Sequence, residues 1–296
     1  TIGETKAFEE IWKDTEKVIG GVVDVHVFDA LYLTQDITNT NSLTTNASNI
    51  VGEVTNSGNY YLTGGTTQDV IRGTTSGTTY IQGDVTFGDS VRKNNISLDG
   101  NTASTDNYRL SLGITNLSNA NSFIANGGDL NLQYLSGTEN YSLGDVIFED
   151  DMGLAIDVSM QGSELKADNI STNSVTGAST NKAYINNLNL SLSGLGAPTY
   201  VKVADNNLKN YVDLGDNTRT HVASITQNGY IITYEKDALG ENTGGFLQFA
   251  FSDITTAARS IAASKVYVRN KSKACDEVGI AFEEFILAFT MISLLL

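Results

Sequence analysis

Short runs that alternate apolar and polar residues recur through most of the chain, separated by clusters of Gly, Asn, Ser and Thr. The stretch "INNLNLSLSG" (185–194) is representative, with leucines at 188, 190 and 192 and polar residues between them. Side chains two residues apart point to the same face of a β-strand. We therefore expect Leu188, Leu190 and Leu192 to face a buried core.

These alternations recur at a steady but irregular interval from about residue 37. One apolar anchor in each of eight runs gives separations of 19, 17, 14, 20, 16, 22 and 18 residues; the anchors are Leu62, Ile81, Leu98, Leu112, Leu132, Phe148, Ile170 and Leu188. Short strands at such spacing suit a sandwich, a barrel or a solenoid. A solenoid buries each strand against the next turn and tolerates imperfect repeats of about 20 residues. Two-residue hairpin signals, which a sandwich usually shows, are scarce before residue 220. We predict an all-β fold, a right-handed parallel β-solenoid, with a β-sandwich as the alternative.

The two ends of the chain have a different pattern. Residues 4–19 place apolar residues on one helical stripe, which predicts a short amphipathic helix. The valines at 23, 25 and 27 then alternate as in a strand. We assign residues 1–36 to this N-terminal helix and strand and residues 37–200 to the solenoid.

Residues 201–270 predict an antiparallel cap. Asn228-Gly229 lies between two alternating runs and favours a type I′ hairpin turn. A strand follows with Leu247, Phe249 and Phe251 on one face, and "SDITTAARSIAAS" (252–264) reads as a helix. The apolar tail, 271–296, ends in about twelve uncharged residues, short of the ~20 that span a bilayer. The length rule favours a buried terminal helix or an artefact of an incomplete reading frame over a truncated membrane segment.

Composition narrows the classes of partner. The formal net charge of −16 would repel nucleic acid and anionic membrane surfaces. Cys275 is the single cysteine, so no intrachain disulfide can form. The chain begins at Thr1 without a basic and apolar leader, which we interpret as a processed product or a fragment.

Two stretches of the sequence are candidates for chemical sites. Ser90 in "VTFGDSVR" resembles the nucleophile block of GDSL-type esterases, but no Asp-x-x-His pair or Gly-x-Asn-Asp loop accompanies it, and His221 and His26 lie at other spacings. We expect a turn between two strands there. Glu149, Asp150 and Asp151 in "FEDDMG" could offer oxygen ligands to calcium, yet adjacent acids cannot all face one ion.

We expect that acidic stretch to be a solvated turn. The acid clusters of pectate-lyase solenoids have a nearby Arg or Lys, whereas basic residues are sparse around this one in the sequence. We assign no catalytic, cofactor-binding or metal-ligating residue and expect a protein that is not an enzyme.

The polar, irregular runs resemble a known family. "DLNLQYLSG" and "YINNLNLSLSG", nearly free of Cys and Pro and followed by "SITQNGYIITYE", resemble the passenger regions of Gram-negative autotransporters of the pertactin type. The resemblance covers residues 37–251. It implies a β-helical passenger exported through an outer-membrane β-barrel carried by a longer chain, and an extracellular or cell-surface location.

The function that follows from this resemblance is a non-catalytic surface module for adhesion or display. The expected partner is a host-surface protein or a glycan, with no nucleic acid and no cofactor. The alternatives are a carbohydrate-active solenoid enzyme, lyase or hydrolase, and a fibre or surface-layer subunit. An enzyme should gather titratable groups and aromatic residues in one groove, whereas the sequence spreads them.

Overall fold

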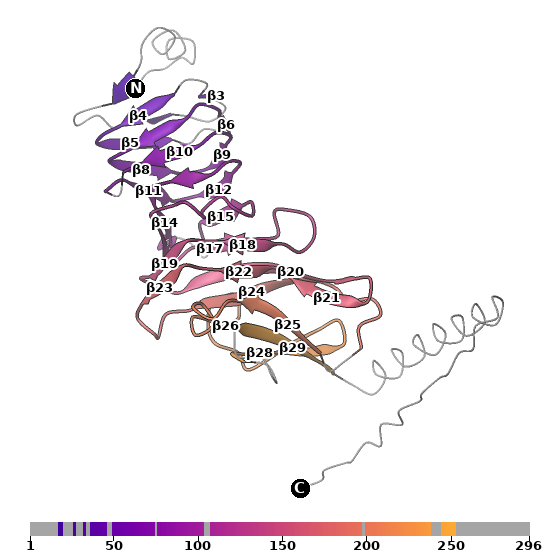
Figure 1. Ribbon diagram of the computed structural model, residues 1–296. Coiled ribbons are helices and arrows are strands. Elements are labelled where there is room, and N and C mark those ends of the chain that lie inside the picture. The colour runs from indigo at the N-terminus through magenta and orange to yellow at the C-terminus, as the bar shows by residue number, and fades with distance from the viewer. Residues whose placement is uncertain are drawn as a thin grey trace, which may run out of the picture.

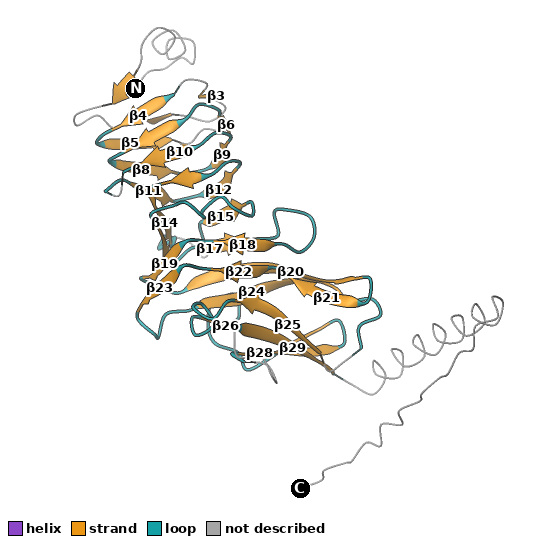
Figure 2. Cartoon of the chain, in the orientation of Figure 1, coloured by secondary structure: helices purple, strands orange, loops and turns teal. Residues whose placement is uncertain are grey.

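The computed structural model describes residues 17–19, 26–27, 32–33 and 36–252, apart from 46–48, 75, 104–106, 197–198 and 238–243. These residues form strands, turns and loops, and no helix occurs among them. The protein is all-β, and its strands are stacked into a column that widens toward β24–β29 (Figures 1 and 2).

Three of the four sheets are built on parallel pairing. Sheet A contains β1 (Lys17–Ile19), β4 (Ile37–Asn39), β7 (Val54–Asn56), β10 (Ile71–Gly73) and β13 (Val91–Arg92). Sheet B contains β2 (His26–Val27), β5 (Ser42–Thr45), β8 (Asn59–Leu62), β11 (Thr78–Ile81), β14 (Asn95–Asp99), β16 (Ser122–Asn126), β19 (Asp145–Phe148) and β23 (Ser174–Gly177).

Sheet C is the longest. It contains β3 (Tyr32–Leu33), β6 (Asn49–Ile50), β9 (Gly65–Thr67), β12 (Asp84–Phe87), β15 (Arg109–Leu112), β17 (Asp129–Asn131), β20 (Met152–Gln161), β24 (Ala183–Ser191) and β26 (Val212–Leu214). All of these neighbours pair in parallel, and β21 (Glu164–Ala167) adds one antiparallel hairpin to the far end of β20.

Sheet D joins parallel and antiparallel strands. It contains β18 (Asn140–Ser142), β22 (Asn169–Ser171), β25 (Thr199–Ala204), β29 (Gly245–Phe251), β28 (Tyr230–Glu235) and β27 (Ile225–Gln227), in that spatial order. The pairs β18–β22 and β22–β25 are parallel, and the remaining three are antiparallel.

The chain visits the sheets in rotation. From β4 to β15 the order is A, B, C, repeated four times, and from β18 sheet D takes the place of sheet A. Ile37 pairs with Val54, Val54 with Ile71 and Ile71 with Val91. One passage, meaning one run of the chain through sheets A, B and C, therefore takes 17 to 20 residues. This parallel arrangement is consistent with a β-solenoid.

Side-chain alternation explains where the core lies. In sheet B the residues Tyr60, Thr79, Ile96 and Phe123 are paired in register and all are fully buried. Their neighbours on each strand point outward and are polar or half-buried. Stacked strands thus place buried positions over buried positions, and one continuous hydrophobic core runs through all four sheets.

The eight anchors of the regular interval do not all mark one column. Leu62, Ile81 and Leu98 are register partners in sheet B, as the interval predicts. The next anchor, Leu112, belongs to sheet C, whereas the partner of Leu98 in sheet B is Ala125. The longer loops after residue 99 lengthen each passage, and the even spacing of the apolar runs conceals this.

The three leucines of 185–194 are buried to different degrees. Leu188 and Leu192 are buried, which confirms the prediction for them, whereas Leu190 is only partly buried against the core. A β-bulge in β24 shifts its register with β20, so that Ile185 pairs with Leu154 but Asn187 pairs with Ala155. Since one extra residue reverses the faces of a strand, burial passes from odd positions to even positions here.

A column of buried asparagines connects sheet A to sheet B. Asn39 Nδ2 donates to Asn56 Oδ1 at 2.8 Å, and Asn56 Nδ2 donates to Asn94 Oδ1 at 3.3 Å. Asn94 comes from two passages further on, and it reaches across Gly73, where a Cβ would lie 2.2 Å from Asn94 Nδ2. Lys93 has a positive φ of 54°, which turns the chain so that Asn94 enters the column.

The C-terminal predictions are confirmed where the structure describes them. Asn228 and Gly229 have φ of 52° and 84° between β27 and β28, as a type I′ turn requires. Leu247 and Phe249 are fully buried on one face of β29, and Phe251 is packed beside them. The helix expected after Ser252 lies outside the described residues.

The predicted N-terminal helix over 4–19 also falls mainly outside the described residues. Its last three residues form strand β1, so the helix prediction is wrong for Lys17–Ile19. Of the predicted strand at 23–27, the structure describes β2, His26–Val27.

Candidate functional site

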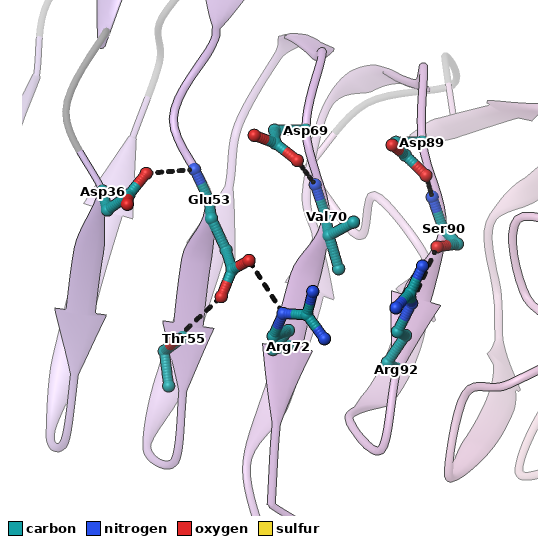
Figure 3. Close-up of polar contacts among 9 residues, drawn as sticks. All are labelled: Asp36, Glu53, Thr55, Asp69, Val70, Arg72, Asp89, Ser90 and Arg92. Atoms are coloured by element: carbon teal, nitrogen blue, oxygen red, sulfur yellow. Dashed lines mark hydrogen bonds and ion pairs between the residues drawn. The ribbon is translucent and has the colours of Figure 1, made fainter.

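Ser90 lies in the bend between β12 and β13, as the turn interpretation expects (Figure 3). Asp89 Oδ1 accepts the Ser90 backbone N–H at 2.5 Å, and Arg92 Nε donates to Ser90 Oγ at 3.3 Å. No histidine contacts Ser90 among the described residues. A nucleophilic serine needs a base that accepts its proton. The neighbour of Ser90 Oγ is instead a hydrogen-bond donor, Arg92 Nε.

Ser90 belongs to a row of polar residues along one edge of sheet A (Figure 3). Asp36, Glu53, Asp69 and Asp89 each stand just before a strand of this sheet. Asp36 Oδ1 accepts the Glu53 N–H at 3.0 Å, and Asp69 Oδ1 accepts the next N–H of its own chain at 2.7 Å.

The glutamate of this row is paired with a cation. Arg72 Nε lies 2.7 Å from Glu53 Oε2, and this contact raises the pKa of the arginine. The carboxylates therefore cap backbone groups and balance arginine charge, which is a structural use.

The acidic stretch Glu149–Asp151 forms a turn between β19 and β20, and Glu149 and Asp150 are exposed. Asp150 Oδ1 accepts the Asp151 N–H at 2.8 Å, and Asp151 Oδ1 accepts the Lys182 N–H at 2.7 Å. Within the described part of the chain, no group of three or more His, Cys, Asp or Glu is placed to hold a metal ion.

A constellation that the sequence did not reveal lies beside this turn, on the outer face of sheet C. Asp129, Gly153, Tyr184 and Asp213 form one row across β17, β20, β24 and β26. A Cβ on Gly153 would lie 2.0 Å from Asp129 Oδ1, so the carboxylate leans over the glycine. The side chains of Asp129 and Asn186 fill the space that a larger residue at position 153 would need.

Arg219 reaches this row from the turn that follows β26. Its Nη2 lies 3.4 Å from Asp129 Oδ1, and its Nη1 lies 3.5 Å from the Asp151 carbonyl oxygen. Both contacts are long for a charge-assisted hydrogen bond, and Arg219 Nε is buried without a partner. The backbone of Arg219 has a positive φ of 59°.

The turn that carries Arg219 is fixed by Asp216. Asp216 Oδ1 accepts from the backbone N–H groups of Thr218 and Thr220 and from the Thr218 hydroxyl. These bonds favour the ionised carboxyl and lower the pKa of Asp216. The turn thus holds the backbone of Arg219 in the left-handed conformation. Strained backbone of this kind is often found at functional sites.

A histidine–carboxylate pair completes the row. His221 Nδ1 lies 3.1 Å from Asp213 Oδ2, and the His221 side chain is 59% exposed. Burial raises the pKa of Tyr184, which belongs to the row, and lowers the pKa of Lys182. This set can exchange protons with a ligand, because a carboxylate orients the exposed imidazole.

The sequence could not reveal this set because its members lie far apart in the chain. Asp129 and Arg219 are separated by 90 residues, and the partner of His221 is Asp213, not the nearer Asp216. Few basic residues lie near the acidic stretch Glu149–Asp151 in the sequence. The fold nevertheless brings Lys182 and Arg219 into contact with Asp151.

Comparison with known proteins gives no relative: no family model matches the chain, and no curated protein or solved structure resembles it significantly. In the described residues no helix is long and apolar enough to cross a membrane.

Proposed function

We propose that the three parallel sheets are the faces of a right-handed β-solenoid, and that this solenoid is a non-catalytic module displayed on a cell surface for adhesion. The observation that carries the proposal is the regular rotation of the chain through sheets A, B and C. Connections between parallel strands of one sheet are right-handed in nearly all proteins, which supports the handedness.

The outer faces support a binding role more than a catalytic one. Thr38 and Thr55 lie side by side on sheet A, and Ser111 and Asn131 lie side by side on sheet C. Asn131 Nδ2 donates to Ser111 Oγ at 2.9 Å. Polar side chains that recur along the faces of sheets A and C favour a long, shallow surface, whereas an enzyme concentrates its groups in a concave site.

The resemblance to pertactin-type passengers supports an extracellular place. Proteins in oxidising compartments often use disulfides for stability, but the single cysteine allows none within this chain. Stacked parallel strands supply a continuous core without crosslinks. An outer-membrane β-barrel on a longer chain would be the export partner.

Adherence of the purified protein tests this function. Fluorescent beads coated with the protein should bind cultured epithelial cells well above beads coated with albumin, and the soluble protein should compete. The same preparation should leave a panel of polysaccharides uncleaved. Equal binding by both kinds of bead would refute an adhesive role, and steady release of sugar ends would refute a non-catalytic one.

A carbohydrate-active enzyme is the second candidate, because of the pairs Asp129–Arg219 and Asp213–His221 on sheet C. An oriented imidazole could take a proton from a sugar while arginine binds a carboxylate. His221→Ala and Arg219→Ala should then each lower the rate of polygalacturonate cleavage by about 100-fold. If the wild-type protein leaves acidic polysaccharides intact, this candidate fails.

A further inference from the structure

The outer face of sheet B carries a row of large apolar side chains in register. Tyr61, Tyr80, Ser97, Ile124 and Ile147 are paired strand by strand across β8, β11, β14, β16 and β19. The two tyrosines and two isoleucines are all half-buried. We call these five residues the sheet B row; its strands run along one side of the column (Figure 1).

The row has a defined shape. The rings of Tyr61 and Tyr80 are stacked, with centroids 4.9 Å apart and an angle of 14° between the planes. Ser97 is 4% exposed and forms a low point between Tyr80 and Ile124. Four steps between strands about 4.8 Å apart give the row a length of roughly 19 Å.

Hydrogen-bonding side chains border the row on both sides. On one side Gln82 Nε2 and Asn126 Nδ2 donate to the two carboxylate oxygens of Asp99, at 2.9 and 3.2 Å. On the other side Ser122 Oγ donates to Asn95 Oδ1 at 2.9 Å. These bonds hold the polar side chains of the borders in fixed positions beside the middle of the row, at β14 and β16.

An apolar strip between two polar borders suits a neutral sugar chain. A pyranose ring has an apolar face, which packs on side chains such as tyrosine, and a rim of hydroxyl groups. A polyanion would meet Asp99 in a chain with a net charge of −16. An anionic membrane would be repelled for the same reason.

An extended peptide fits less well. Peptides that join a sheet do so at its edge, by backbone hydrogen bonds. On the face of sheet B the backbone groups of β8 to β19 already bond to neighbouring strands. The row therefore offers a peptide side-chain contacts only.

We propose that the sheet B row binds a linear neutral glycan along the column, with sugar rings packed on Tyr61, Tyr80, Ile124 and Ile147. This inference rests on the proposed role as a surface-binding module and names the class of its partner. Its binding surface is a different face from the charged row of sheet C.

Binding of defined sugars tests the inference. Cellohexaose, chitohexaose and maltohexaose are titrated into the protein by calorimetry, with oligogalacturonate as the charged comparison. At least one neutral sugar should bind, and oligogalacturonate should bind more weakly. The double variant Tyr61→Ser/Tyr80→Ser should lose at least about tenfold in affinity, because both rings are removed.

Two further variants control for a nonspecific effect of removing a tyrosine and for misfolding of the double variant. Tyr134→Ser removes a tyrosine that is 52% exposed elsewhere and should leave the affinity unchanged. Ile147→Thr changes the far end of the row to the residue found at the next position, Thr176, and should weaken binding even if the double variant does not fold. The inference is overturned if no neutral sugar binds, if oligogalacturonate binds more tightly, or if affinity survives both row changes.

Cell adherence separates this inference from the proposed function. Periodate oxidation of the cell-surface glycans should abolish bead adherence if the glycan is the partner. Adherence that survives periodate and the row variants would overturn the glycan assignment and leave the adhesive function standing. If beads coated with the wild-type protein do not adhere even to untreated cells, the adhesive function itself is refuted.

Discussion

At the scale of single residues, Asp168 is the most unusual ionisable group. Its side chain is fully buried, and its two oxygens accept the backbone N–H groups of Glu139 and Asp157 at 2.8 and 2.7 Å. Burial raises the pKa of Asp168 from its ordinary 3.8 to about 7, with a smaller contribution from the carboxylates of Asp157 and Glu139, against the lowering by the two N–H groups.

The raised pKa predicts a loss of stability as the pH rises. The folded protein holds a proton on Asp168 that the unfolded chain has released between about pH 4 and pH 7. The stabilisation is therefore complete below pH 4 and is lost as the pH passes through 7. Asp168→Asn cannot ionise, and its amide opposes one of the two N–H donors.

The difference in unfolding free energy between wild type and Asp168→Asn should consequently be largest at about pH 4 and below, and shrink toward pH 8. Urea unfolding at several pH values measures it, and the shared effect of the −16 charge cancels in the difference. A difference that does not change with pH would show that Asp168 is ionised throughout.

Leu188 and Leu190 make a second prediction at this scale. Leu188 is 7% exposed, whereas Leu190 is only partly buried. Leu188→Ala should cost about 2–4 kcal/mol of unfolding free energy, and Leu190→Ala less than about half of that. Thermal or urea unfolding of the two variants gives the comparison. Equal losses would mean that the bulge at 186–187 does not set the burial of this strand.

At the scale of the elements, the asparagine column links successive passages. Asn56 Nδ2 donates to the Thr78 carbonyl as well as to Asn94, and Asn56 Oδ1 accepts from Asn39. Asn56→Ala leaves several buried polar groups without partners and should cost about 3 kcal/mol. Asn59→Ala, at an exposed side chain on the next strand, should stay within about 0.5 kcal/mol. Similar losses in urea unfolding would remove the column as a source of stability.

What the sequence could predict depended on how local each element is. The turn at Asn228-Gly229 needs two positive φ angles in adjacent residues, so two letters are enough to predict it. The column of Asn39, Asn56 and Asn94 could not be predicted, because Asn94 must cross the passage that contains Gly73. Likewise Arg219, which follows β26, contacts Asp129 on β17 only because sheet C places β17, β20, β24 and β26 side by side.

At the scale of the whole molecule, the length of each passage of the chain through the three sheets decides how well the sequence predicts the strand register. Passages before residue 99 are short and place Leu62, Ile81 and Leu98 in one column, which is why an interval of apolar residues predicts them. Later passages carry long loops, and the interval then links residues of different sheets. The class of fold was therefore predictable, whereas the register of its second half was not.

We expect the antiparallel end of sheet D to form early in folding and to act as a template. The hairpin β27–β28 closes over two residues, as the hairpin β20–β21 also does, and therefore loses little loop entropy. Beside it, β29 pairs with both β28 and β25 and buries Leu247 and Phe249. We expect this part to form first and then to offer an apolar edge on which the parallel passages stack, from β25 and β24 backwards.

Growth from the C-terminal end predicts unequal effects of two deletions. Removal of residues 222–251 takes away β27, β28 and β29 and should slow refolding of the remainder far more than removal of 37–66, an equal length. Each parallel passage gains little stability until a neighbour exists, so loss of the first template affects every later step. Refolding followed by far-UV circular dichroism after dilution from urea measures the two rates. Equal rates, or a C-terminal fragment without a protease-resistant core, would show that the column can nucleate at any passage.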